Sequence, residues 1–133
     1  MREILFRGKQ VGNDQWVEGD LRHLETGGVG IVTEQNLFAV VVHPETVGQY
    51  TGLKDKNGQR IFEGDILREQ RFHFGDIFYI IEWGESSFGA RLHRNGKTSD
   101  IVTAIDDSEY GFSTDNLEII GNIHDNPELI KEE

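Results

Sequence analysis

Two carboxylates separated by one residue, Glu63 and Asp65, are the side chains best spaced for chemistry in this chain. In an extended strand residues i and i+2 point to the same face, so this pair could share a divalent cation in a metal-dependent hydrolase. The glycine between them favours a bend that spoils this geometry, and Gly-Asp pairs are typical of turns. We therefore favour turn structure over a metal site here, and equally for Glu18 and Asp20.

The other residue types used in catalysis form no motif. Cysteine is absent, which excludes thiolate zinc sites and cysteine nucleophiles, and the five histidines lack a zinc-ligand spacing. The chain contains no Gly-X-Ser-X-Gly and no glycine-rich phosphate loop. The sequence therefore predicts no catalytic residue, no metal ligand and no cofactor, and we expect a protein that is not an enzyme.

A polar segment, Thr46–Lys54, is more elaborate than a plain connection needs and supplies a candidate interaction surface. The alternative is structural: Thr46 and Thr51 would satisfy backbone groups, and Tyr50 would fill the core. The structural role is favoured, because buried backbone groups must be satisfied whereas ligand binding is optional. Together with the Glu-Gly-Asp carboxylates, the candidate surface comprises Thr46, Gln49, Tyr50, Thr51, Lys54, Glu63 and Asp65.

An aromatic patch, Arg71-Phe72-His73-Phe74, is a second place where binding is conceivable. Its rings could stack on a base or a sugar. Two aromatic residues around a polar one more often mark a strand edge with buried rings, and we favour that interpretation.

The elements that must position these residues are β-strands. Apolar residues recur mostly with a period of two, and 16 glycines against two prolines punctuate the chain. A short helix is expected at residues 126–131, with Asn126 as N-cap and Pro127 at its first position. Strands are expected at residues 4–8, 15–21, 29–33, 37–43, 47–51, 59–62, 66–70, 76–83, 88–93 and 117–121.

Several turns and loops can be assigned within this pattern. Asn57-Gly58 predicts a two-residue hairpin turn in which both residues take positive φ, and Asn95-Gly96 predicts a second hairpin. Phe38–Val42 is apolar at consecutive positions, which predicts a strand covered on both faces, either a central strand or one that crosses between two sheets. Residues 98–116 are polar and acidic, so we expect a solvent loop there.

One pattern occurs twice: Trp16–Leu21 and Ile61–Ile66 each have two apolar residues, then Glu-Gly-Asp, then an apolar residue. The pattern predicts a strand corner at each place. It records either two related units or two uses of one convenient turn, and the second is favoured because few positions agree. We expect a single compact unit over residues 1–133, with two sub-units open as an alternative: an N-terminal β subdomain, 1–48, and an SH3-like β-barrel, 49–125.

Four separated segments resemble one known family. The longest is Pro44–Asp65, and the others are Arg2–Lys9, Trp16–Gly19 and Ile119–Leu129. In this order they resemble the YopX family of small proteins encoded by bacteriophages and prophages. The resemblance implies a mostly β fold built from small barrel-like units, a phage or prophage origin, and no established biochemical activity.

The net charge of −11 is distributed unevenly. Residues 1–97 hold twelve Lys/Arg against fourteen Asp/Glu, giving −2, whereas residues 98–133 hold one against ten, giving −9. Non-specific nucleic-acid binding depends on basic residues that neutralise phosphates, so the sequence argues against it. An acidic surface that captures a basic partner or mimics nucleic acid is electrostatically easier.

The chain has no apolar run long enough to span a bilayer, and its N-terminus lacks the apolar core of a signal peptide. Together with the absence of cysteine, this fits the cytoplasm of a bacterial host. We therefore expect no membrane association.

Three classes of function remain open. The first is a non-enzymatic interaction or assembly module that forms a homo-oligomer, since small β units leave strand edges to be covered. The second is a host-directed binder whose acidic surface captures a basic host or phage protein. A metal-dependent hydrolase using Glu63 and Asp65 is ranked last.

Overall fold

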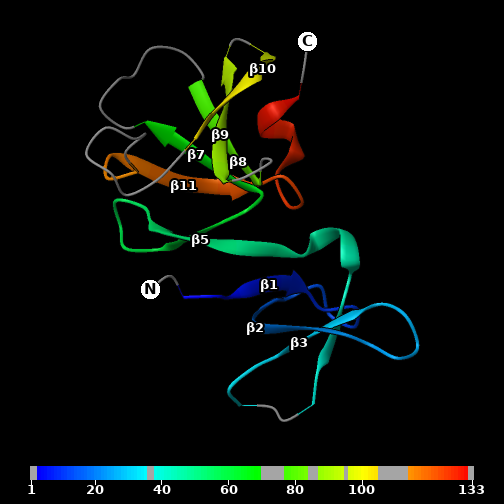
Figure 1. Ribbon diagram of the computed structural model, residues 1–133. Coiled ribbons are helices and arrows are strands. Elements are labelled where there is room, and N and C mark those ends of the chain that lie inside the picture. The colour runs from blue at the N-terminus through cyan, green and yellow to red at the C-terminus, as the bar shows by residue number, and fades with distance from the viewer. Residues whose placement is uncertain are drawn as a thin grey trace. The chain divides into compact units, whose positions relative to one another are not determined.

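The computed structural model is all-β and describes residues 3–35, 38–69, 77–83, 87–94, 96–104 and 114–131 (Figure 1). Two short 3-10 turns are the helical segments within these ranges, and the sheets are antiparallel. The chain divides into two compact units, Met1–Gly52 and Leu53–Glu133, which we call unit 1 and unit 2. The strand β5 contains the boundary, which lies just after the boundary at residue 48 considered from the sequence.

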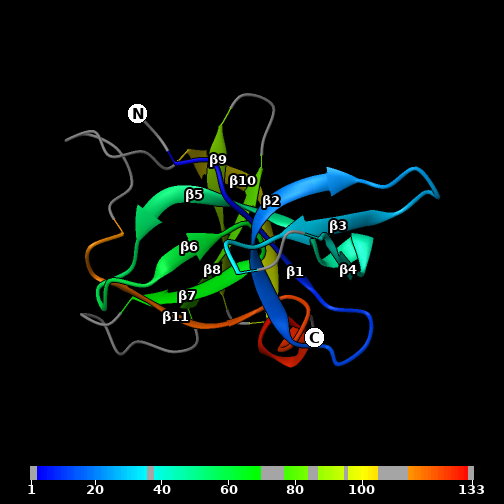
Figure 2. The same cartoon turned by 90° about the horizontal axis from the view of Figure 1, so that it is seen from below.

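Unit 1 is a meander in which each strand pairs with the next one along the chain, apart from β5, which pairs with β1. The left-handed glycines Gly27 and Gly28 join β2 to β3, a hairpin that can be followed in Figure 2. The strand order is β4-β3-β2-β1-β5. The elements are β1 (Phe6–Lys9), β2 (Trp16–His23), β3 (Val29–Val32), β4 (Val40–Val42), the 3-10 turn η1 (Pro44–Thr46) and β5 (Gly48–Lys54).

The edge of β4 that faces away from β3 is bonded to the end of β1. A bridge pairs Gln10 with Val42, and the amide of Val11 donates to the carbonyl of Val41 at 3.1 Å. Val42 is buried against Gly8, where a Cβ atom would lie 2.9 Å from the Val42 Cγ2 atom. Glycine at position 8 therefore lets β1 approach the core of unit 1 closely.

The prediction that Phe38–Val42 is a strand covered on both faces is wrong. β4 is the last strand of its sheet, and Val41 is 49% exposed while Phe38 is 80% exposed. The side chain of Val42 is buried, whereas that of Val41, on the opposite face of the strand, is exposed. A run of consecutive apolar residues usually indicates a strand buried on both faces. In this segment it instead forms an exposed apolar surface.

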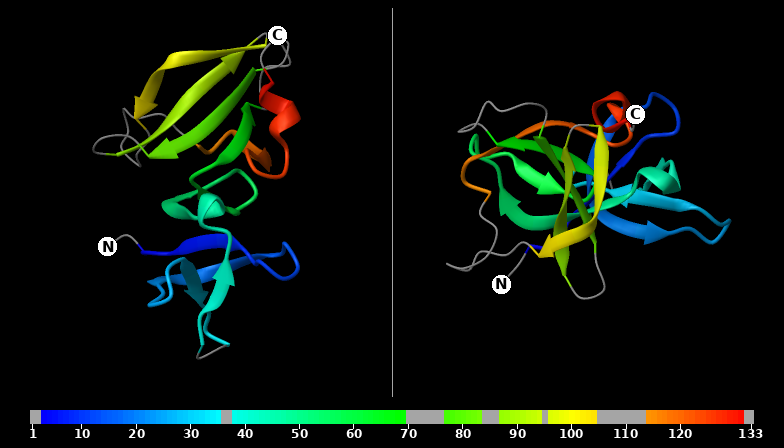
Figure 3. Two further views of the ribbon diagram at one scale, coloured as in Figure 1. Left: turned by 90° about the vertical axis from the view of Figure 1, so that its right-hand side faces the viewer. Right: turned by 90° about the horizontal axis from the view of Figure 1, so that it is seen from above.

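Unit 2 contains a five-stranded sheet of order β10-β9-β8-β7-β11 (green, yellow and orange in Figure 3). Its elements are β6 (Arg60–Phe62), β7 (Asp65–Glu69), β8 (Ile77–Trp83), β9 (Phe88–Arg94), β10 (Lys97–Ala104), β11 (Leu117–Asn122) and the 3-10 turn η2 (Pro127–Ile130). The core of this unit is formed by Ile61, Leu67, Ile81, Phe88, Ala90 and Leu117.

The predicted SH3-like barrel over residues 49–125 is not confirmed. β10 and β11 are the two ends of the five-stranded sheet, and no pairing between described residues closes it. β6 belongs to the other sheet, next to β5. The all-β prediction is confirmed, and the closed barrel is not confirmed.

The predicted terminal helix is replaced by the 3-10 turn η2. Pro127 begins it, as expected, but the side chain of Asn126 does not cap it. Instead, Asn126 Oδ1 accepts the amide of Asn122 at 3.2 Å. Four residues are also too few for the hydrogen bonds that stabilise an α-helix.

The loop predicted for residues 98–116 is wrong at its beginning, because β10 runs through Ala104 and pairs with β9. Lys97 lies opposite Arg94, and Thr98 lies opposite His93. An end strand of a sheet tolerates polar side chains, so its composition resembles that of a loop. Residues 105–113 lie outside the described part of the chain.

The hairpin predicted at Asn57-Gly58 is present, but it is not a two-residue turn. The amide of Gly58 donates to the carbonyl of Asp55 at 3.0 Å, and the amide of Asp55 donates to the carbonyl of Gln59 at 2.9 Å. Gly58 has a φ of +80°, whereas Asn57 has negative φ. This is a three-residue loop, in which glycine takes the left-handed position after an ordinary turn.

Candidate functional site

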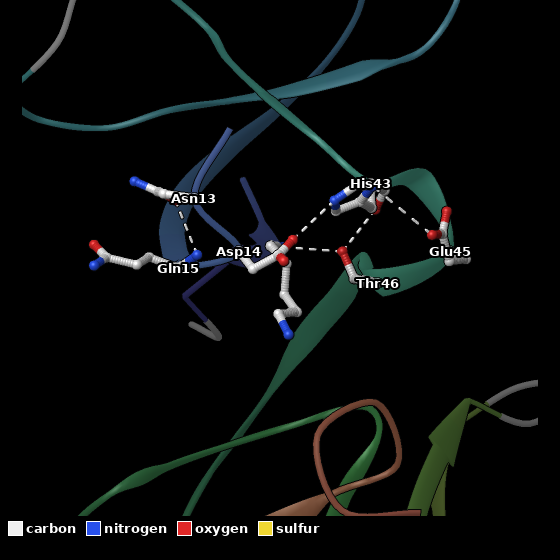
Figure 4. Close-up of polar contacts among 7 residues, drawn as sticks. Asn13, Asp14, Gln15, His43, Glu45 and Thr46 are labelled. Carbon is white, nitrogen blue, oxygen red and sulfur yellow. Dashed lines mark hydrogen bonds and ion pairs between the residues drawn. The ribbon is translucent and has the colours of Figure 1, made fainter. Parts of the chain in front are cut away.

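A cluster of polar side chains joins the β1–β2 loop to the η1 turn in unit 1, and Figure 4 shows it. His43 Nε2 lies 3.1 Å from Asp14 Oδ1, and His43 Nδ1 lies 4.0 Å from Glu45 Oε1. We call Asp14, His43, Glu45 and Thr46 the loop cluster. A histidine held by a carboxylate is the arrangement most suggestive of acid–base chemistry in the described residues.

The backbone of the β1–β2 loop presents Asp14 to the histidine. Asp14 has a φ of +56°, and its amide donates to the carbonyl of Gln10 at 3.0 Å. Asn13 Oδ1 accepts the amide of Gln15 at 3.0 Å, which fixes the other side of the loop (Figure 4). A left-handed conformation in a residue other than glycine carries strain, and aspartate tolerates it better than most residues.

Thr46 could act as a nucleophile in the loop cluster only if its hydroxyl were free to contact His43, but this hydroxyl is bonded to the backbone. The Thr46 hydroxyl donates to the carbonyl of His43 at 2.6 Å and accepts the amide of Lys9 at 2.9 Å. The hydroxyl is therefore held by backbone groups and is not aimed at the imidazole. The cluster lacks the contact between a base and a nucleophile that defines a hydrolytic dyad.

The same geometry does not favour a metal site. Asp14 and Glu45 lie at opposite nitrogens of the His43 ring, so one cation could not contact all three side chains. Across the described ranges, no three His, Asp or Glu side chains are arranged to hold a metal ion. The side chains of Asp14 and Glu45 are 70% and 73% exposed. Such exposed pairs contribute little to the free energy of folding, so the loop cluster only weakly stabilises the contact between the β1–β2 loop and η1.

Four of the seven residues of the candidate interaction surface are buried. Thr46, Tyr50, Thr51 and Asp65 are at most 7% exposed. The amide of Tyr50 donates to the carbonyl of Leu5 at 2.7 Å, which extends the pairing of β5 with β1. These side chains line the interior, as the structural alternative requires. Gln49 and Glu63 are half-buried, and Lys54 is exposed.

Glu63-Gly64-Asp65 forms a corner at which the chain passes from β6 to β7. Gly64 has a φ of +94°, and its amide donates to the carbonyl of Ile81 at 2.7 Å. Asp65 is 1% exposed, and its Oδ2 atom accepts the amide of Phe62 at 2.8 Å. The second carboxylate of the pair is thus used to hold the turn.

Glu18-Gly19-Asp20 lies inside β2, at the point where this strand changes partners. Residues 16–19 pair with β1, and residues 20–23 pair with β3. A Cβ atom on Gly19 would collide with the carbonyl oxygen of Val32. Glu18-Gly19-Asp20 therefore lies within a continuous strand, whereas Glu63-Gly64-Asp65 forms a turn, and Asp20 is exposed where Asp65 is buried.

Asp55 is the structurally most engaged carboxylate that sequence reasoning missed. It is 6% exposed, and its Oδ1 atom accepts the amides of Asn57 and Gln59, each at 2.9 Å. Its Oδ2 atom accepts the amide of Ile119 at 3.1 Å. Aspartate two residues before Asn-Gly is an available sequence indication of a side-chain-stabilised turn. No sequence pattern indicated the contact of Asp55 with β11.

Unit 1 also contains a stack of cations on an aromatic ring. The Arg7 guanidinium carbon lies 4.6 Å from the centre of the Trp16 ring, and Lys9 Nζ lies 5.9 Å from it. Lys9 and Trp16 are opposite each other on β1 and β2. These basic groups therefore stabilise the β1–β2 pair through cation–π contacts.

The polar groups of unit 2 mainly tie its strands together. Arg91 donates two hydrogen bonds to Glu82, at 3.0 and 2.6 Å, and a third to the carbonyl of Ser99 at 2.7 Å. The buried side chain of His93 contacts Thr98 Oγ1 at 2.8 Å. These contacts cross β8, β9 and β10.

Tyr79 on β8 is a titratable group whose pKa is perturbed by its environment. Burial raises the pKa of Tyr79, and the negative charge of Glu69 raises it further. Both effects disfavour the phenolate. Tyr79 packs against the core of this unit.

Exposed apolar side chains gather at the β4 end of unit 1. The Gln10–Val42 bridge places Val11 opposite Val41, and these side chains are 51% and 49% exposed. Gly30 lies opposite Val41 on β3, and Ala39 fills the space where a Gly30 side chain would be. Phe38 lies three residues before Val41 in the same segment and is 80% exposed. We call Val11, Phe38, Ala39 and Val41 the apolar face.

The aromatic patch Arg71-Phe72-His73-Phe74 lies outside the described residues. Its two interpretations therefore stay as predictions. None of the helical segments in the described ranges is long and apolar enough to cross a membrane.

Comparison with known proteins identifies the family. The family model described as YopX protein matches residues 5–131. The chain belongs to the YopX family. No curated protein matches this YopX-family chain. Among solved structures, the crystal structure of protein EF1440 from Enterococcus faecalis is similar at 21% identity and a TM-score of 0.55, over 98% of this chain and 100% of that one. At this identity the similarity shows a common fold.

Proposed function

We propose that this YopX-family protein is a non-enzymatic interaction module that self-associates through the apolar face of unit 1, in the cytoplasm of a bacterium that carries the phage or prophage. The observation that carries the proposal is the exposure of Val11, Phe38 and Val41. Single exposed apolar residues are ordinary, but two valines opposite each other with a phenylalanine in the same segment form a patch.

The polar side chains give indirect support. Thr46, Asp55 and Asp65 are all buried, and each of them bonds to backbone groups within its own unit. They stabilise turns and are not directed at a ligand. These three side chains are therefore engaged within the protein and are not available to a partner.

The charge distribution favours a second copy of the chain as the occupant of the apolar face. Residues 1–52 hold four Lys/Arg against seven Asp/Glu, giving −3, whereas residues 53–133 hold nine against seventeen, giving −8; the sum is −11. Two identical acidic chains repel each other least where charge is sparse. Because stable interfaces use about 20–30 residues a side, a patch this small gives a weak, concentration-dependent dimer.

Light scattering over a concentration series tests self-association. The wild-type mass should rise with concentration, and the rise should be stronger at high salt, because salt screens the repulsion between acidic chains. Phe38→Ser and Val41→Thr should each weaken the rise. Ile4→Thr is the matched control, because Ile4 is 68% exposed but lies outside the apolar face. A wild-type mass that stays monomeric at every concentration would refute the proposal.

The acidic residues 98–133 favour a second candidate function, the capture of a basic protein. Their charge of −9 would attract such a partner over a long range. Fluorescence anisotropy with a labelled lysine-rich peptide tests this. Binding that disappears at high salt would support capture, and its salt dependence is opposite to that expected for self-association.

A further inference from the structure

The Asn57-Gly58 dipeptide lies in the hairpin loop between β5 and β6, and one aspartate holds its backbone. Asp55 Oδ1 accepts the amides of Asn57 and Gln59 at 2.9 Å, and the Asp55 carbonyl accepts the amide of Gly58 at 3.0 Å. Three successive amides thus donate to Asp55. Asp55 is itself anchored to β11 through the amide of Ile119.

Asparagine followed by glycine can modify itself, because glycine has no side chain to obstruct attack by its backbone nitrogen. The Gly58 nitrogen would lose its proton to a solvent base and form a bond with Asn57 Cγ, and ammonia would leave from that carbon. Water then opens the resulting cyclic imide to aspartate or isoaspartate. The net reaction exchanges ammonia for water and requires no oxidant or reductant.

The hydrogen bonds of the loop oppose the first step. The proton that Gly58 must lose is donated to the Asp55 carbonyl. Ring closure must also turn the peptide between Asn57 and Gly58, which breaks that bond. In addition, the Asp55 carboxylate contacts the Asn57 amide, and a negative charge beside the loop disfavours a second one on the Gly58 nitrogen.

We infer that Asn57 is a masked deamidation site, which Asp55 protects while the hairpin is closed and which reacts when the hairpin opens. Asn57 is exposed, so burial does not protect it. Isoaspartate would lengthen the backbone by one carbon, and the hydrogen bonds to Asp55 could not all re-form. Conversion of Asn57 would therefore be an irreversible modification that records opening of the hairpin.

The rate of conversion in the folded protein tests this inference. The intact chain and a synthetic peptide of residues 54–62 are incubated in mildly alkaline buffer, and Asn57 conversion is followed by mass spectrometry after digestion. We expect conversion in the folded chain to be at least about tenfold slower, because opening must break several backbone hydrogen bonds. Equal rates would overturn the inference.

A pair of variants assigns the protection to Asp55. Asp55→Asn keeps the shape of the side chain, but it removes the negative charge and leaves one acceptor oxygen. Conversion at Asn57 should therefore accelerate. Asp20→Asn removes the same charge from an exposed position in unit 1 and should leave the rate unchanged. Acceleration by both variants, or by neither in a folded Asp55→Asn chain, would contradict the assignment.

Amide hydrogen exchange covers the case in which Asp55→Asn fails to fold. In the wild-type chain the Gly58 amide should exchange far more slowly than in the peptide, because it is bonded to Asp55. Exchange at the peptide's rate would show an open hairpin and refute the masking.

Discussion

The two Glu-Gly-Asp segments have the same three residues and use them in different ways. At residues 18–20 the strand continues, glycine makes room for the carbonyl of Val32, and the aspartate is exposed. At residues 63–65 the chain turns, glycine takes positive φ, and the aspartate is buried on the amide of Phe62. The same tripeptide therefore does not determine the local backbone conformation, which depends on the strands that pair with it.

The largest expected difference between the segments is at the aspartates. Asp65→Ala should lower the free energy of unfolding by roughly 2–3 kcal/mol, because it leaves the Phe62 amide without its charged acceptor. Asp20→Ala, at an exposed position, should change it by less than about 0.5 kcal/mol. Urea unfolding followed by circular dichroism measures both. Equal losses would mean that the aspartates have equivalent roles.

The glycine of the first segment should give the next largest effect. Gly19→Ala should destabilise unit 1 by about 2 kcal/mol, because its Cβ atom would force the backbone of Val32 to move. Gly12→Ala is a matched control, since a Cβ atom there meets nothing within 4 Å. Denaturation of both variants should separate them. A Gly19→Ala chain as stable as the control would show that the close approach is not needed.

The smallest effect concerns the far end of the strand that Asp65 begins. There burial, and to a smaller extent Glu69, raise the pKa of Tyr79, so folded Tyr79 keeps its proton at a pH where the unfolded chain has lost it. Stability should therefore fall as pH rises from the ordinary tyrosine pKa of about 10 through the folded value.

Glu69→Gln should lower the Tyr79 pKa by removing the smaller of its two causes. NMR of labelled tyrosine, assigned with Tyr79→Phe, measures the titration. Glu63→Gln, in the turn before the strand, should leave the Tyr79 titration unchanged. If Glu69→Gln also leaves it in place, burial alone perturbs Tyr79.

Most strands were predictable from the sequence, because their apolar residues alternate or form short runs, and glycine turns such as Gly27-Gly28 separate several of them. β8 shows why: its apolar residues on both faces pack in the interior as predicted, from Phe78 to Ile81. β10 was not predictable, because its polar end resembles a loop and depends on pairing with β9. The prediction for Phe38–Val42 was wrong because Phe38 and Val41 are apolar and yet exposed to solvent.

The candidate site was less predictable than the fold. The structural role of Thr46 follows from rules about satisfying backbone groups, and its hydroxyl does bond the backbone. The contacts of Asp55 were predictable only within its own turn, because its other partner, Ile119, is 64 positions away in the sequence. The opposition of Val11 and Val41 likewise depends on strand pairing. Sequence periodicity carries no information about such distant contacts.

Methyl NMR on a dilution series tests self-association through the apolar face most directly. Isotope-labelled valine and isoleucine methyl groups report both units in one sample. The resonances of Val11 and Val41 should shift with protein concentration, while those of Ile61 and Ile81 in the core of unit 2 should stay constant. Constant shifts at Val11 and Val41, or shifts confined to unit 2, would contradict the proposed interface.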